Sequence, residues 1–199
     1  MSSNLHKFAG KGDLSKVQEE LNKGADPNYV WIQNNTTPLL QASSGGHALI
    51  ARLLLEHGAD PNRGQITMQY TPLMAASSKS FASVVSLLLD NGADANWKEA
   101  QENMTALLFS IARNDAEHIA VPSLLLEHGA KINWQTTTGT TALMLAAWKG
   151  YALKVRFLLE NGADKSLKDN DGKTAEEIAR EQGYEEIANE IRHFVRSKI

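Results

Sequence analysis

A Gly-Ala pair recurs five times along the chain, each time after a leucine-containing run. Its glycines stand 34, 34, 37 and 33 residues apart, at Gly24, Gly58, Gly92, Gly129 and Gly162. A threonine opens the following segment in nearly the same rhythm, at Thr37, Thr71, Thr105, Thr141 and Thr174. Two markers with one period indicate internal repeats. Because a unit of about 33 residues cannot bury its apolar face alone, such units must stack into one elongated body.

The stretch from residue 71 to residue 96 shows how one unit is built. Thr71 can cap a helix, and Pro72 suits the first helical position, which needs no backbone donor. The small Ala75 and Ala76 let this first helix lie close to its neighbour. A second helix then presents apolar residues at three-to-four spacing, namely Val84, Val85, Leu88 and Leu89. Each unit is therefore predicted to be a pair of short antiparallel helices.

A left-handed residue is expected where the chain reverses between the two helices. Glycine occupies this position in three units, as Gly46, Gly150 and Gly183. Ser80 is the counterpart in the third unit, and Asn114 is expected to serve similarly in the fourth.

The repeats resemble those of the ankyrin repeat family. Residues 37–62 (TPLLQASSGGHALIARLLLEHGADPN) and 141–164 (TALMLAAWKGYALKVRFLLENGAD) are similar to its consensus nearly throughout, while 5–28 and 173–194 resemble an opening and a closing repeat. The resemblance implies an all-α fold, an α-solenoid of stacked helix-turn-helix repeats with hairpin-like fingers between them. We expect one domain over 1–199, with repeats at 1–32 (N-terminal cap), 33–66, 67–100, 101–136, 137–169 and 170–199 (C-terminal cap).

Three departures from the family pattern bear on the structure. The family's histidine after the threonine is replaced by apolar residues, namely Leu40, Met74, Leu108 and Met144. The first three connections to the next threonine are one residue longer than usual and lack the turn glycine, so irregular fingers are expected. Three extra residues between Thr105 and Gly129 predict a bulge near ARNDAEHIAVPS, between the two helices of the fourth repeat.

Composition narrows the class of partner. The 20 basic and 23 acidic residues give a net charge of −3, which offers no electrostatic reason to expect nucleic acid. No apolar stretch approaches the roughly 20 residues of a membrane span, so no membrane partner is expected. The beginning of the chain shows no secretory signal and cysteine is absent, so the expected location is cytoplasmic.

No catalytic, metal or cofactor site emerges from the residue patterns. The six histidines include no zinc-type pair around a glutamate. DNDG at 169–172 cannot belong to a calcium loop, because Leu167 and Ile178 fall where oxygen ligands are needed. GKGD at 10–13 lacks the ending of a phosphate loop. We therefore expect a protein that is not an enzyme and uses no cofactor.

Proteins similar to this one bind other macromolecules through the turn tips and inner helices, which form a concave strip. All four tryptophans fall in these regions, and basic or aromatic residues accompany them. The candidate contact residues are Tyr29, Trp31, Arg63, Tyr70, Lys79, Trp97, Met104, Arg113, Trp134, Trp148 and Lys149. Because such residues dominate interface hot spots, we expect a protein partner with an acidic or amphipathic segment. The alternative is that each ring only covers a gap between neighbouring turns.

The leading functional prediction is a scaffold or adaptor that presents a rigid concave surface to one protein. One alternative is a regulatory or inhibitory subunit of an enzyme. Another is self-assembly through the aromatic strip, so that a monomer is the expectation and a homodimer its alternative.

Overall fold

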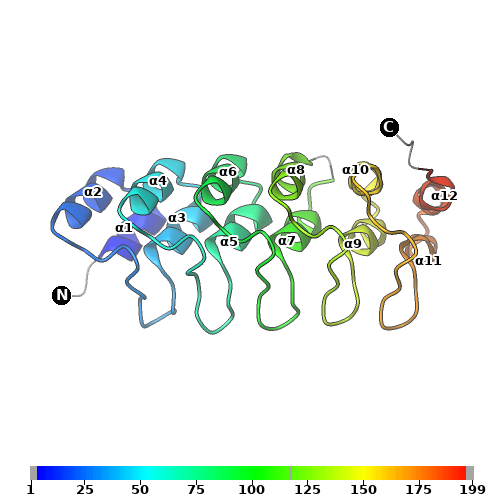
Figure 1. Cartoon of the computed structure of the whole chain (residues 1–199), viewed down its shortest axis with the longest axis horizontal. Helices are drawn as coiled ribbons and strands as arrows, with labels where there is room; N and C mark the ends of the chain where they lie inside the picture. The colour runs from blue at the N-terminus through cyan, green and yellow to red at the C-terminus, as the bar shows by residue number, and fades with distance from the viewer. Residues whose placement is uncertain (1–3, 117, 196–199) are drawn as a thin grey trace.

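The computed structural model describes residues 4–116 and 118–195, which form a single row of stacked helix pairs (Figure 1). The inner helices are α1 (Leu5–Lys11), α3 (Pro38–Gly45), α5 (Pro72–Ser78), α7 (Ala106–Ala112), α9 (Ala142–Trp148) and α11 (Ala175–Glu181). The outer helices are α2 (Leu14–Asn22), α4 (Ala48–Glu56), α6 (Ala82–Asp90), α8 (Ala120–Glu127), α10 (Ala152–Glu160) and α12 (Glu185–His193). Loops extend below the inner helices as fingers. This all-helical solenoid confirms the predicted fold class.

The repeated threonines start the inner helices as predicted. The Thr71 hydroxyl accepts a hydrogen bond from the Met74 backbone N–H at 3.3 Å, and Pro72 occupies the first turn. Thr37, Thr141 and Thr174 cap their helices in the same way, whereas Thr105 makes no side-chain cap. The buried Met74 sulfur lies 3.5 Å from the Thr71 backbone nitrogen. Methionine therefore combines an apolar contact with a weak acceptor at the place of the family's histidine.

The reversals between paired helices use left-handed residues in most repeats. Gly46, Ser80 and Gly150 have φ values of 72°, 57° and 73°. A Cβ atom at Gly150 would lie 2.6 Å from the Tyr184 ring, so a larger residue there would also displace that ring. The prediction for Asn114 is wrong: its φ is not positive, and α7 is followed instead by Arg113 at φ −58° and ψ 138°.

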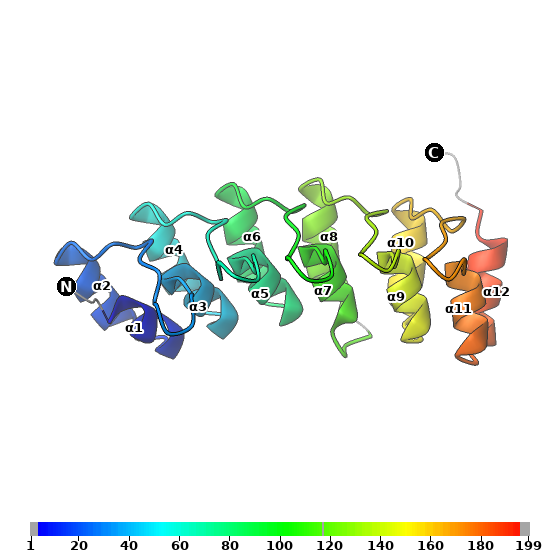
Figure 2. The same ribbon diagram turned by 90° about the horizontal axis from the view of Figure 1, so that it is seen from below.

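The predicted bulge lies between α7 and α8. Residues 113–119 separate these helices, whereas only residues 79–81 separate α5 from α6. Figure 2 shows the longer loop projecting beyond the end of α7. The inserted residues extend this connection and leave the stacking of the flanking helices intact, because α7 still packs against both α5 and α9.

The five fingers share one backbone design with two tip lengths. In the first three, the closing hydrogen bond joins residues five apart, in the pairs Trp31–Thr36, Gln65–Tyr70 and Glu99–Met104. In the last two it joins residues four apart, Thr136–Thr140 and Asp169–Lys173. The left-handed tip residue is Asn35, Gln69 or Asn103 in the longer fingers and Gly139 or Gly172 in the shorter ones. The longer fingers are therefore wider but regular, unlike the expected irregularity.

Successive repeats are joined by a continuous core and by asparagine bridges. The core includes leucines that are fully buried along the outer helices, at Leu54, Leu88, Leu125 and Leu158. The Asn62 side chain donates to the Gly92 carbonyl at 3.2 Å and accepts from the Asp94 N–H at 2.7 Å. Asn28 and Asn96 make the same pair of bonds. These bridges set the spacing between neighbouring repeats.

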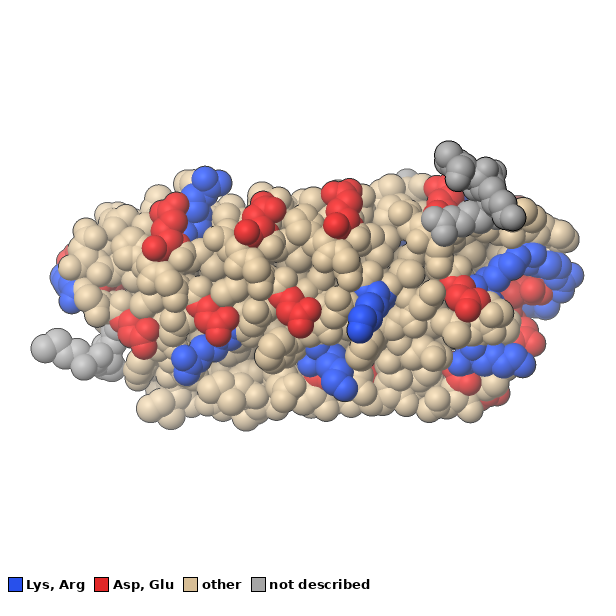
Figure 3. All heavy atoms as spheres, in the orientation of Figure 1, with Lys and Arg blue, Asp and Glu red and all other residues tan. Residues whose placement is uncertain are grey.

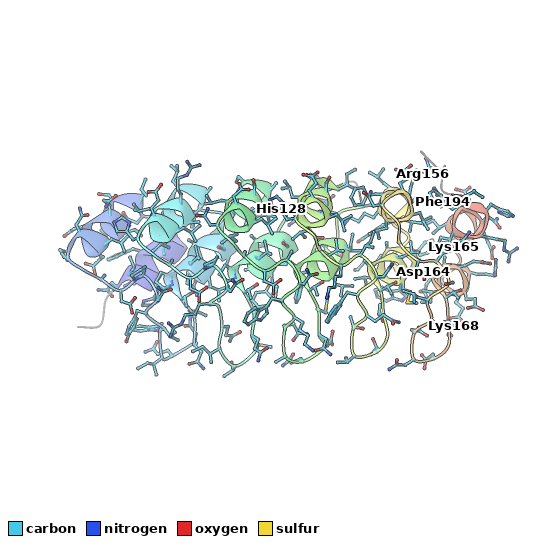
Figure 4. The ribbon with its side chains drawn as sticks, viewed as in Figure 1. His128, Arg156, Asp164, Lys165, Lys168 and Phe194 are labelled. Atoms are coloured by element: carbon cyan, nitrogen blue, oxygen red, sulfur yellow. The ribbon has the colours of Figure 1, made fainter. Side chains whose placement is uncertain are left out.

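The closing repeat neutralises much of its acidic charge internally. Glu176 pairs with Arg180 and Arg192 at 2.9 and 2.7 Å, and these bonds lower the pKa of its carboxyl. Lys165 donates to the carbonyls of Ile191 and Arg192 in the last turn of α12, and to that of Phe194 just after the helix at 2.9 Å (Figure 4). A cation at the carboxyl end of a helix is favourable, so this lysine secures the terminal helix to the preceding repeat.

Candidate protein-binding surface

The surface formed by the fingers and the inner helices carries every candidate contact residue. Figure 2 views the stack from the finger side, with the inner helices behind the finger tips. The structure distributes the candidates among an inner-helix end, a hollow beside Trp97, a groove between two fingers, and inter-repeat contacts. Their environments differ enough to separate residues that stabilise the fold from residues that remain exposed.

Trp148 is the most exposed tryptophan and ends α9. The residue is 51% exposed, and the Lys149 ammonium lies 5.4 Å from its ring. Lys149 also donates to the Asn114 side chain at 3.1 Å, which places the lysine between α9 and the inserted loop. An indole with half of its surface in water contributes little to the core, so Trp148 can be covered by another molecule.

Two further basic candidates lie at corresponding places near the ends of inner helices. Lys79 is exposed and donates to the Ser44 carbonyl at 2.7 Å, which closes the end of α3. Arg113 pairs with Asp115 at 3.7 Å. Among the ion pairs of the described residues, neither Lys79 nor Lys149 has an acidic side chain as partner. These two lysines leave net positive charge at this edge.

Trp97 borders a hollow on the preceding finger. The residue is 38% exposed, and the hollow of about 460 Å³ is also lined by Arg63 and Ile66. The backbone carbonyl of Arg63 accepts a hydrogen bond from the Thr37 hydroxyl at 2.9 Å. The Arg63 backbone is thus fixed by the preceding repeat, while its side chain is exposed.

Trp134 and Trp31 make contacts that the stack itself uses. The Trp134 indole N–H donates to the Asn103 carbonyl of the preceding finger at 2.8 Å, and its half-buried ring packs on the core. Trp31 stacks on His6 of α1 with ring centroids 4.0 Å apart. Tyr29, two residues earlier, is also half-buried. These rings therefore pack against other residues of the same chain.

Tyr70 and Met104 lie in a groove between the second and third fingers, which we call the finger groove. Its volume is about 420 Å³, and its lining includes Met68, Tyr70, Glu99, Glu102, Met104 and Phe109. The Tyr70 and Phe109 rings meet edge to face at 5.3 Å. Burial raises the pKa of Tyr70, and its hydroxyl donates to Ser78 at 3.3 Å. This groove is mainly apolar with carboxylates at its wall and rim.

Glu99 is a groove residue that sequence analysis missed. Its carboxylate accepts backbone bonds from Gln101, Glu102 and Met104 at 2.7, 2.6 and 3.1 Å, although the residue is only 6% exposed. Burial raises the pKa of this carboxyl, but the backbone donors outweigh burial and leave it below its usual value. Glu99 is therefore ionised at neutral pH. Asp169 begins the DNDG turn of the fifth finger and likewise accepts backbone hydrogen bonds within its finger. Alignment of the third finger with this turn was the sequence signal that could have identified Glu99.

A row of acidic residues follows the outer-helix ends but has a structural explanation. Figure 3 shows acidic side chains repeating along this face. The position two residues after each repeat glycine holds Asp26, Asp60, Asp94, Lys131 and Asp164. Each of the four aspartates accepts the backbone N–H two residues later, at 2.8–2.9 Å. These residues form the turn that leads into each finger, so their charge alone does not mark a site.

Neither a metal centre nor a membrane span is evident in the part of the chain that the structure describes. No cluster of three or more histidine, aspartate or glutamate side chains there is arranged to hold a metal ion. No helix there is long and apolar enough to cross a membrane.

Paired helices, regular fingers and an uninterrupted core define a helical repeat protein of the protein-binding class. The family model described as ankyrin repeats (three copies) matches residues 5–99 and 94–169. The chain belongs to the ankyrin repeat family. Ankyrin repeats are protein–protein interaction modules.

The known proteins similar to the chain include an RNA hydrolase and a chain of a peptidase complex. The NAD-capped RNA hydrolase NUDT12 of Homo sapiens and that of Macaca fascicularis are each 49% identical over 51 residues, 26% of this chain. The chain covers only 11% of those proteins. One chain of the solved complex between the Bd0816 predatory endopeptidase from Bdellovibrio bacteriovorus and immunity protein Bd3460 is 28% identical, with a TM-score of 0.83. That similarity covers 96% of this chain and 97% of the other.

Proposed function

We propose that the chain is a non-catalytic scaffold that binds one partner protein along its fingers and inner-helix ends. The observation that carries the proposal is the exposure of Trp148 and Trp97 on that side, where the two residues are 51% and 38% exposed. The remaining contact candidates are Tyr29, Trp31, Arg63, Tyr70, Lys79, Met104, Arg113, Trp134 and Lys149. Their contacts within the chain divide them into exposed residues, which can contact a partner, and residues that pack against neighbouring repeats and so stabilise the surface.

Exposed tryptophans favour binding for a thermodynamic reason. An indole buries a large area and freezes few torsions, so covering it stabilises a complex more than covering most other side chains. Trp148 sits at a helix end that packs without its ring, and Lys149 holds a cation over the indole at 5.4 Å. Such a pair can take an apolar partner residue beside an acidic one.

The partner segment that fits this edge is acidic or amphipathic. Lys79 and Lys149 bond to a carbonyl and an amide oxygen, so their charges are not neutralised by those contacts. A partner carboxylate would complement them, and a neighbouring apolar side chain would cover Trp148. We propose that one copy of the chain binds the partner, with nucleic acid and membranes excluded as principal partners.

An inhibitory role is the second candidate. The similarity to one chain of the peptidase–immunity protein complex extends over nearly all of both chains at 28% identity. As this second candidate, we propose that the partner is an enzyme whose access to substrate this chain blocks. An adaptor would leave the activity of its partner unchanged, whereas an inhibitor would reduce it in proportion to the bound fraction.

The contact surface is tested by paired variants in a capture experiment with chemical cross-linking and mass spectrometry. Trp148→Ala and Trp97→Ala are each expected to reduce recovery of the cross-linked partner at least about tenfold without a loss of thermal stability. Leu49→Ala is the matched control, because Leu49 is 66% exposed on the outer helix α4. Unchanged recovery with both tryptophan variants would refute the proposal. A concentration-dependent increase in scattering mass for the isolated chain would favour self-assembly instead.

A further inference from the structure

The finger groove combines an adaptable apolar surface with negative charge. Met68 and Met104 contribute flexible, polarizable side chains from neighbouring fingers. Tyr70 lies along α5, because its hydroxyl reaches Ser78 near the end of that helix, and Phe109 of α7 meets its ring at 5.3 Å. Four side chains from two fingers and one inner helix therefore form the apolar part of a groove of about 420 Å³, a volume that can hold the stem of a long side chain.

The charge around this surface is negative and has no basic counterpart in the groove. Glu99 is held ionised in the wall by three backbone donors, while Glu102 is exposed at the rim. Neither glutamate takes part in an ion pair among those found in the described residues. Lys98 is adjacent to Glu99 in sequence but places its ammonium 5.8 Å from the Trp134 ring. No lysine or arginine is among the described lining residues.

We propose that the finger groove receives a basic side chain, arginine or lysine, from an extended segment of the partner protein. The aliphatic stem would lie on Met68 and Met104, and the cationic head would face Glu102 and the aromatic rings. This site rests on the proposed function, since it requires a protein partner, but it specifies a chemistry at a different place from the Trp148 edge. A basic residue in the finger groove, together with an acidic residue and an apolar residue beside Trp148, describes an amphipathic segment that runs along the fingers and inner-helix ends.

Charge complementarity favours this occupant over the two others that could enter the groove. A purely apolar side chain would remove water from the carboxylates of Glu102 and Glu99 without providing a cation or a hydrogen-bond donor in its place, which is unfavourable. An acidic side chain would meet like charge. An arginine contributes a hydrocarbon stem and a planar cation that stacks on aromatic faces. A lysine contributes a hydrocarbon stem and a point charge.

The test uses short peptides as probes and the methionine methyl groups as reporters. Acetyl-glycyl-leucyl-X-leucyl-glycine amide is titrated into the whole chain, with arginine, norleucine or glutamate at X. Met68 and Met104 line the groove, whereas Met74 and Met144 are buried in the core. The arginine peptide is expected to move the Met68 and Met104 methyl resonances selectively and to bind at least about fivefold more tightly than the norleucine peptide.

Variants identify the charge responsible. Glu102→Gln keeps the size of an exposed side chain outside the finger's hydrogen bonds, so it should fold normally and weaken arginine-peptide binding about threefold to tenfold. Glu56→Gln, on an exposed outer-helix end, is the control and should leave binding unchanged. Glu99 is not the test residue because it holds the finger turn together.

Several outcomes would overturn the assignment of a basic side chain to the finger groove. Equal binding of the norleucine peptide would mean an apolar occupant, and tighter binding of the glutamate peptide an acidic one. Concentration-dependent Met68 and Met104 shifts without peptide would mean a second copy of the chain. If no peptide moves these resonances while Trp148→Ala still reduces capture, the basic-residue site fails but the proposed function stands. Unchanged capture by the Trp148 and Trp97 variants would overturn the proposed function.

Discussion

Lys154 offers a direct test of how the bulged fourth repeat is stabilised. Lysine stands here in the outer helix α10 at the place where earlier repeats bury Ile50 and Val84, and its side chain is fully buried. Its ammonium donates to the carbonyls of Ser110 and Ile111 at 3.2 and 3.4 Å. The end of α7 has no left-handed turn to satisfy its last carbonyls, so Lys154 takes over that task.

Burial lowers the pKa of Lys154 from 10.5 to about 8, with Arg113 and Lys149 acting in the same direction and Asp115 opposing them. The folded chain therefore releases this proton near pH 8, whereas the unfolded chain retains it until near pH 10.5. Because the unfolded state binds more protons in that window, stability due to this group rises with pH. At 1.36 kcal/mol for each pKa unit, the full gain is at most about 3 kcal/mol.

The comparison variant is Lys154→Met, which keeps the length of the side chain and removes its charge. At pH 7 its effect on the free energy of unfolding should be small, because relief from burying a cation offsets the loss of two hydrogen bonds. At pH 10 the variant should be about 2–3 kcal/mol less stable than the original chain. Urea unfolding from pH 7 to pH 10 measures the difference. Parallel stability curves for the two chains would refute the buried-lysine account.

Two further variants test the contacts between repeats. Asn62→Ala removes the bonds to Gly92 and Asp94 and should lower the free energy of unfolding, measured in urea, by about 1–3 kcal/mol. The control variant Asn189→Ala, on the exposed face of α12, should have little effect. Equal effects of the two variants would contradict the bridging role of Asn62. Trp134→Phe removes the indole bond to the Asn103 carbonyl and should cost about 0.5–1.5 kcal/mol in thermal unfolding, with partner capture retained; a stable variant that loses capture would reverse this assignment.

Local signals predicted most of the architecture. Threonine caps, the Gly-Ala helix ends and three-to-four apolar spacing each depend on neighbouring residues, so the chain carries them visibly. The turn at Asn114 was predicted wrongly for the same reason. Asparagine can adopt the left-handed conformation. However, the three inserted residues lengthen the connection between α7 and α8, so the chain reverses there without a left-handed residue at position 114.

The residues missed by sequence analysis depend on contacts far along the chain. Lys154 differs from its apolar counterparts in other repeats, but its bonds to α7 cross 43 and 44 residues. Glu99 is recognisable only when the third finger is aligned with the fifth despite their different tip lengths. The finger groove likewise needs Phe109 and Tyr70 from separate repeats to meet, which no pattern within one repeat predicts.

The tryptophans show how far composition can indicate a binding surface. Their positions outside the helical core pattern predicted a single aromatic strip, but only side-chain contacts separate their roles. Trp134 donates to a neighbouring finger and Trp31 stacks on His6, whereas Trp97 and Trp148 keep large exposed areas. The assignment of all these residues to partner binding remains a prediction.

Hydrogen–deuterium exchange of the chain alone and cross-linked to its captured partner tests the proposed binding surface most directly. The account predicts slower exchange in the complex at fingers 65–70 and 99–104 and at the end of α9, with α4, α6 and α8 unchanged. Protection confined to those outer helices, with the fingers exchanging as in the free chain, would contradict it.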